Sequence, residues 1–252
     1  YDFPRERSGA NQMIHPTAIV DDSAEVADDV EVGAFTLVHG GVRLGSGTVI
    51  GSHCSIGEPT ELAQGRPLIL GANCLVRSHT VIYAGSTFEA GLETGHHVTI
   101  REGITAGVNL RVGTLADLQG DATFGRFVRL HSNVHIGKGS TVGDFVWIFP
   151  FTVLTNDPHP PSDIALAGVV VEDFAVIATM TCIAPGVRVG ARSLVAASSM
   201  VTRDVPPATI VKGSPAKPAG PTSDVLLRDG SGRPAYPWTT HFHRGYPRQV
   251  LE

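Results

Sequence analysis

A period of six residues governs most of this chain. Apolar side chains stand at every sixth position in three series: Ile14 to Ile56, Leu70 to Leu154, and Val171 to Val201. Of these 29 positions, only Thr94 is polar. A period of six matches neither an α-helical face nor the alternation of a single strand, and it is typical of hexapeptide β-solenoids. The repeat therefore predicts an all-β solenoid.

Each hexapeptide is expected to form one short strand and a corner, so that three of them close a triangular coil. The 29 hexapeptides then give 29/3, or about ten, coils. The residue at each sixth position points into the prism and stacks on its equivalents, because a single coil cannot bury its inner face. A sandwich of short strands is the alternative, but it predicts no constant period.

The composition of the chain argues against several classes of binding partner. The net charge is −5 and no basic stripe is present, which argues against nucleic acid. The three cysteines (Cys54, Cys74 and Cys182) are odd in number and not clustered, which favours a reducing compartment and no metal site. No apolar run approaches the roughly 20 residues of a membrane span, and no signal peptide is visible. We therefore expect a cytoplasmic protein with no membrane partner.

The repeat phase divides the chain into three parts. Residues 1–12 lack the phase and are interpreted as a leader or flexible arm, and residues 13–205 form the solenoid. Residues 206–252 are expected to be an irregular extension that caps unpaired strand edges at the open end. The extension holds aromatic residues for packing and two arginines that could meet phosphates: Tyr236, Trp238, Phe242, Tyr246, Arg244 and Arg248.

Two insertions interrupt the repeat. The first lies between Ile56 and Leu70, and the second spans residues 155–168 (TNDPHPPSDIALAG). Three prolines stiffen the second insertion, and four titratable residues lie in or beside it: Asp157, His159, Asp163 and Glu172. Loops that leave a regular scaffold commonly carry function, so we predict a positioned polar surface here. An inert corner insertion is the alternative.

Residues 18 apart should form columns on successive coils, about 4.8 Å apart. Asp117 and His135 have this spacing. An Asp one coil from a His can orient its ring and stabilise its charged form, so this pair is a candidate for function.

Two further columns bring polar residues together. His79, His97 and Asn133 share one column, for which an ordinary corner ladder is the alternative. Asp121 and Asp157 share another at about 10 Å, unless the second insertion displaces Asp157.

At superfamily level the sequence resembles the left-handed β-helix acyltransferases. The hexapeptide pattern, the opening at residues 13–18 (MIHPTA) and the ending at residues 212–217 (KGSPAK) carry the resemblance, over about residues 13–217. It implies a left-handed parallel β-helix of about ten coils with two extruded loops and an irregular C-terminal tail. Residues 133–139 (NVHIGKG), followed by residues 155–157 (TND), resemble N-acyltransferases that act on nucleotide-linked 3-amino-deoxysugars.

The resemblance implies a homotrimer with active sites between adjacent prisms and an acyl-CoA donor, acetyl-CoA or a longer one, along the solenoid. It assigns the anchoring of the sugar amine to Asn156 and Asp157, and Asn133 is a further substrate-binding candidate. The ending at residues 212–217 is expected near the coenzyme: Lys212, Gly213, Pro215, Ala216 and Lys217. No metal is expected.

A catalytic base is harder to assign. In the sister lipid-A-type acyltransferases the catalytic His lies two residues after an inward aliphatic residue. Here His131 lies one residue after Leu130, and His135 lies five after it. An amine is a good nucleophile once neutral, so a strong base is dispensable for an amine acceptor. A hydroxyl acceptor depends more strongly on such a base. The candidate catalytic residues are Asp157, which would hold the amine, and His131 or His135.

The leading hypothesis is an acyl-CoA-dependent N-acyltransferase acting on a nucleotide-linked amino sugar. A sugar O-acetyltransferase is favoured instead if a His–carboxylate pair proves essential. A γ-type carbonic anhydrase, with zinc held between subunits, is a third hypothesis, because His96 and His97 with His131 and His135 approach its ligand pattern. A purely structural solenoid would need neither the polar loop nor the KGSPAK ending.

Overall fold

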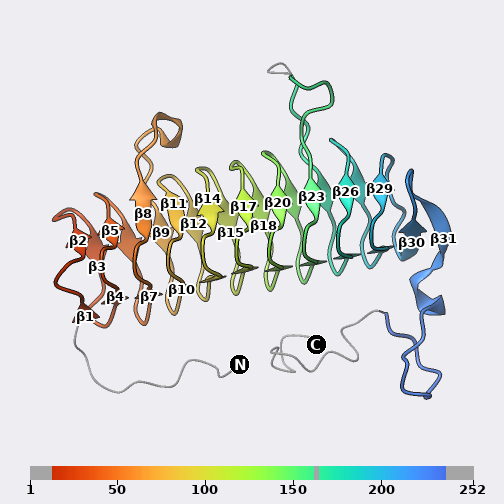
Figure 1. Ribbon diagram of the computed structural model, residues 1–252, viewed down its shortest axis with the longest axis horizontal. Coiled ribbons are helices and arrows are strands. Elements are labelled where there is room, and N and C mark those ends of the chain that lie inside the picture. The colour runs from red at the N-terminus through yellow and green to blue at the C-terminus, as the bar shows by residue number, and fades with distance from the viewer. Residues whose placement is uncertain (1–12, 162–164, 237–252) are drawn as a thin grey trace.

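Three parallel β-sheets wrap around one apolar core and form a long triangular prism (Figure 1). The computed structural model describes residues 13–161 and 165–236. The predicted leader, Asp163, Trp238, Phe242, Arg244, Tyr246 and Arg248 lie outside the described residues.

Each of the first nine coils contributes one strand to each sheet, and the next coil contributes β28 to sheet A and β29 to sheet B. Sheet A runs in the order β1 (Met13–Ile14), β4 (Glu31–Val32), β7 (Val49–Ile50), β10 (Leu75–Val76), β13 (Glu93–Thr94), β16 (Arg111–Val112), β19 (Arg129–Leu130), β22 (Trp147–Ile148), β25 (Val176–Ile177), β28 (Leu194–Val195), β30 (Thr209–Lys212) and β31 (Lys217–Pro221). Sheet B runs β2 (Ile19–Val20), β5 (Leu37–Val38), β8 (Ser55–Glu58), β11 (Val81–Tyr83), β14 (Thr99–Ile100), β17 (Asp117–Leu118), β20 (His135–Ile136), β23 (Val153–Leu154), β26 (Cys182–Ile183) and β29 (Met200–Val201). Sheet C runs β3 (Glu25–Val26), β6 (Arg43–Leu44), β9 (Ile69–Leu70), β12 (Thr87–Phe88), β15 (Thr105–Ala106), β18 (Thr123–Phe124), β21 (Thr141–Val142), β24 (Val170–Val171) and β27 (Arg188–Val189).

The register of these strands is the one that the six-residue period predicts. In most strands the first residue faces outward and the second is buried, and partners on adjacent coils lie 18 residues apart, as Asp117 and His135 do. The inward side chains form one continuous cluster from Val30 to Val211. Burial of this column by neighbouring coils is therefore the main source of stability.

The one polar residue of the six-residue series, Thr94, is accommodated by a hydrogen bond. Thr94 is fully buried, and its hydroxyl accepts from the backbone N–H of Arg77 at 3.0 Å. A buried hydroxyl with a partner costs little, so the series continues through this coil.

Both insertions leave the prism after a strand of sheet B and project from the same side (Figure 1). The first follows β8 and contains the 3₁₀ helix η1 (Glu61–Ala63). The second follows β23, and its neck is closed where Ala167 N–H donates to the carbonyl of Asn156 at 2.8 Å. The outer face of sheet B between β8 and β23 thus lies between the two loops.

The chain after β29 extends sheet A and then turns back on it. β30 pairs in parallel with β28, and β31 pairs antiparallel with β30. The 3₁₀ helix η2 (Thr222–Asp224) follows. Pro218 and Pro221 on β31 cannot donate to a further strand, which limits pairing at this edge.

Candidate functional site on the outer face of sheet B

The predicted pair of Asp117 and His135 forms in the structure. Nδ1 of His135 lies 3.0 Å from Oδ2 of Asp117, with both side chains roughly one-third exposed. A carboxylate only accepts hydrogen bonds, so Nδ1 carries the proton and Nε2 is left for a substrate. Register explains the contact, because β17 and β20 are neighbours and both residues face outward.

A third side chain completes this pair. Nε2 of Gln119 donates to the same Oδ2 of Asp117 at 2.6 Å. The pKa of Asp117 lies below its usual range, chiefly because of the hydrogen bond from His135, and partial burial opposes this. Asp117 is therefore held as an ionised acceptor that fixes the imidazole ring.

The base of the second loop lies beside this pair. Gly137, two residues after His135 on the same face of the strand, has no room for a side chain. A Cβ there would lie 3.1 Å from Cβ of Asn156 and 2.6 Å from the carbonyl oxygen of Leu154. Glycine thus allows the predicted amine-anchoring residue Asn156 to pack next to the strand that carries His135.

Asp157 belongs to the loop and not to the column predicted for it. Its Oδ1 accepts from the backbone N–H of His159 at 2.9 Å. The corner position above Gly139 is taken by Gly168, because the insertion displaces the intervening residues. The insertion thus displaces Asp157 from the column that it would otherwise share with Asp121, and Asp121 pairs with Nζ of Lys138 at 3.0 Å.

The other base candidate, His131, lies on a different face. It follows β19 of sheet A, and its ring stacks on Phe149 with centroids 4.6 Å apart. Burial, and secondarily the charge of Arg129, lowers the pKa of His131. The structure therefore separates His131 from the pair formed by Asp117 and His135.

Lys138 occupies the position two residues after the inward Ile136, where the sister enzymes were expected to hold a His. Its ammonium is paired with Asp121. A protonated, ion-paired lysine cannot accept a proton, so His135 is the better base candidate in this part of the chain.

The column of His79 and His97 forms a ladder of stacked rings. Phe35, His53, His79 and His97 stack in order at a corner, with centroid distances of 5.1, 5.0 and 4.5 Å. Leu115 interrupts the ladder before Asn133, which adopts the same left-handed backbone. Burial and the neighbouring imidazoles lower the pKa of His79.

The ending at residues 212–217 makes a turn against the last strand of sheet B. The N–H of Ala216 donates to the carbonyl of Met200 at 2.7 Å, and the N–H of Met200 donates to the carbonyl of Gly213 at 3.0 Å. Three strand steps, about 14 Å, separate β29 from β20. The predicted donor-binding turn joins β30 and β31 of sheet A, and it thus abuts the last strand of the sheet that carries His135. Lys212 and Lys217 flank the turn and are exposed.

The sequence reasoning missed Tyr83, Arg101 and Gln119. Their spacing of 18 residues places them in one column that continues to Gly137, so the column signal could have found them. It also missed a cluster near the first loop, where Ser55 Oγ lies 2.9 Å from Nε2 of His39 and bonds to Glu58.

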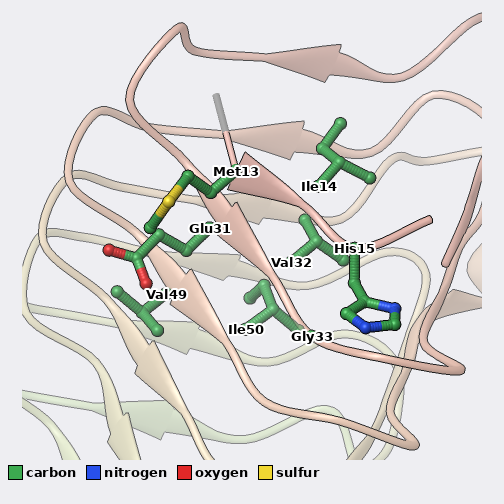
Figure 2. Close-up of a pocket in the computed structure, with 8 residues that line it drawn as sticks. All are labelled: Met13, Ile14, His15, Glu31, Val32, Gly33, Val49 and Ile50. Carbon is green, nitrogen blue, oxygen red and sulfur yellow. The ribbon is translucent and has the colours of Figure 1, made fainter. Parts of the chain in front are cut away.

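A shallow groove of about 420 Å³ lies elsewhere, over β1, β4 and β7 (Figure 2). None of the predicted site residues lines it: its walls are Met13, Ile14, His15, Glu31, Val32, Gly33, Val49 and Ile50. The groove lies four strand steps from β19, the strand of sheet A that precedes His131. The candidate site is therefore defined by the contacts among its side chains and not by this groove.

Residues 13–161 and 165–236 lack both a candidate metal site and a candidate membrane span. No group of three or more His, Cys, Asp or Glu side chains there is arranged to hold a metal ion. In the same residues, no helix has the length and apolar character that crossing a membrane requires.

The sequence of the chain is similar to that of a known acyltransferase over about half of its length. No family model matches the sequence. An acyl-[acyl-carrier-protein]–UDP-N-acetylglucosamine O-acyltransferase from Saccharophagus degradans is 36% identical over 132 residues, which are 52% of this chain and 48% of that protein. The chain thus spans about half the length of this curated relative.

Solved structures match over more of the chain. The Arabidopsis UDP-N-acetylglucosamine acyltransferase superposes with a TM-score of 0.71 and 20% identity, covering 86% of this chain and 77% of that one. The Campylobacter jejuni UDP-N-acetylglucosamine acyltransferase gives 0.59 and 18%, covering 94% and 80%. At these identities the likeness concerns the fold, and it confirms the predicted left-handed β-helix. The chain therefore shares the fold of these UDP-N-acetylglucosamine acyltransferases.

Proposed function

We propose that this chain is an acyl-CoA-dependent N-acyltransferase acting on the amino group of a nucleotide-linked amino sugar. The observation that supports it most is the placement of three features along sheet B and against its last strand, β29. These are the Asp117–His135 pair, the loop base at Asn156 and Asp157, and the turn at residues 212–217. Acyl transfer between a nucleotide sugar and a carrier thioester is the class of reaction named for the 36%-identical relative.

The chemistry follows from this placement. The neutral sugar amine attacks the thioester carbonyl, the C–N bond forms, and the C–S bond breaks to release CoA as the thiolate. Nε2 of His135 accepts the proton that the nitrogen loses and passes it to the thiolate. Asp157 orients the amine, and Asp117 keeps the imidazole in the tautomer with a free Nε2. The products are an amide and CoA.

The donor has a path along sheet B. Outward side chains between His135 and the turn are Val153, Cys182 and Met200, one on each successive strand. This half-buried, largely apolar strip suits the extended arm of a CoA, whose nucleotide end would then meet Lys212, Gly213, Pro215, Ala216 and Lys217.

O-acylation is the second candidate. It is favoured by the Asp117–His135 pair, because a hydroxyl needs a base more than an amine does, and by the name of the relative. A panel of nucleotide sugars that carry either an amine or a hydroxyl at the same ring position, assayed by thiol release, decides between them. Turnover of hydroxyl sugars alone would overturn N-acylation.

Cys182 reports on the donor path. It is half-exposed on the proposed path, whereas Cys54 and Cys74 are buried. We expect a maleimide to label one thiol in the native protein, slowly because burial raises the pKa of the Cys182 thiol, and we expect CoA to protect it. Mass spectrometry after labelling measures this. Cys182→Ser is the control. Equal labelling with and without saturating CoA would show that the donor does not bind along this strip.

Assembly is a further expectation. Active sites between prisms require three copies, and flat prism faces suit threefold packing. Light scattering should give about three times 26.5 kDa. A monomer that keeps full activity at nanomolar concentration would contradict an intersubunit site.

A further inference from the structure

Arg101 is held in one orientation on the outer face of sheet B. Its Nε and Nη2 lie 3.0 and 3.2 Å from the two carboxylate oxygens of Glu102, which is only 3% exposed. Its Cζ lies 4.8 Å over the ring of Tyr83. A buried carboxylate and an aromatic face together fix the plane of the guanidinium, so little freedom is left to lose on binding.

One edge of this guanidinium remains available. Glu102 takes the edge formed by Nε and Nη2, and no residue of the described chain accepts a hydrogen bond from Nη1. The edge formed by Nη1 and Nη2 therefore presents two parallel N–H groups. That geometry matches two oxygens of a phosphate, which Arg binds in bidentate fashion.

Arg101 also lies at a suitable distance from the reacting centre. Its charge acts on Asp117 and contributes to the lowered pKa of that carboxyl. From β14 to β20 there are two strand steps, about 10 Å. In a nucleotide-linked amino sugar, one pyranose ring separates the amine from the anomeric diphosphate. An amine beside His135 can therefore place the diphosphate toward Arg101, on the side away from the donor strip.

We propose that Arg101, positioned by Glu102 and Tyr83, binds the diphosphate of the nucleotide-linked acceptor. The identity of the acceptor as an amino sugar rests on the proposed function, but the diphosphate site does not. Arg101 thus makes the enzyme select nucleotide-linked sugars over free ones.

Binding of nucleoside diphosphates tests the site without any turnover. UDP, GDP and inorganic pyrophosphate are titrated calorimetrically into the wild-type protein and into Arg101→Gln and Arg101→Lys. Loss of a charge-assisted contact should raise Kd about 10- to 150-fold in Arg101→Gln. Arg101→Lys keeps a charge for Glu102, so it guards against misfolding, and it should still weaken binding because it lacks the fork. Arg77→Gln on sheet A is the matched control, since Arg77 and Arg101 have side chains equally exposed at 31% and each pairs with a Glu.

The outcomes separate this inference from the proposed function. Tight binding in the wild type and in Arg77→Gln, with weak binding in both Arg101 variants, supports the site even if no amino sugar is acylated. Equal Kd values in the wild type and Arg101→Gln, or no binding of any of the three probes to the wild type, overturn it. For an acylated acceptor, the kcat/KM advantage of the nucleotide sugar over the free amino sugar should shrink in Arg101→Gln, and an unchanged ratio also overturns the inference.

Discussion

Val142→Asp is expected to abolish the folded solenoid or to lower its melting temperature drastically. Val142 is 1% exposed in β21 and stacks between Phe124 and Val171 of the neighbouring coils. An aspartate there would bury an unpaired charge among apolar side chains, which costs several kcal/mol. Each coil is stabilised by its neighbours, so the damage should spread beyond β21. Soluble yield and thermal melting by circular dichroism measure the effect.

The control for this substitution is the preceding residue. Thr141 is exposed on the same strand, so Thr141→Asp should leave the melting temperature within a few degrees of the wild type. If the two variants melted alike, the assignment of inward and outward positions would be wrong.

The period made the scaffold predictable because each coil repeats the same packing problem. One inward residue per hexapeptide suffices to set register, and the eighteen-residue spacing then sets every lateral neighbour. The hydrogen bond from the backbone of Arg77 to Thr94 could not be foreseen, because it depends on the path of the backbone at one corner.

The same spacing explains which parts of the site could be predicted. Asp117 and His135 lie in uninterrupted coils, so the column predicted for them is present in the structure. Asp157 follows the point where the chain leaves the prism, and the periodic count loses meaning there. The Arg101–Glu102 pair joins adjacent residues around a corner, so neither a column nor a face of the sheet indicates it.

Asp157→Asn is expected to lower kcat/KM for the amino sugar about 10- to 150-fold, from loss of a charge-assisted contact of roughly 1.5–3 kcal/mol. The asparagine oxygen can still accept from the N–H of His159, so the turn at the loop base should persist. KM for the acyl-CoA should barely change, because the contact that is lost is proposed to hold the amine and not the donor. Steady-state kinetics with each substrate varied in turn measures both constants. Asp157→Ala, which also removes the acceptor for the N–H of His159, should cost more.

Asp117→Asn distinguishes anchoring of the amine from base catalysis. It would leave His135 without the carboxylate that fixes its tautomer, and general-base catalysis is worth about 10²–10⁴ in rate where a reaction depends on it. An amine acceptor should therefore suffer more from Asp157→Asn than from Asp117→Asn, and a hydroxyl acceptor should show the opposite order. Wild-type kinetics in Asp157→Asn would show that the second loop is only a corner insertion with no role in binding the amine. A dominant loss in Asp117→Asn would instead assign the enzyme to O-acylation, because only a weakly nucleophilic acceptor depends so strongly on the base.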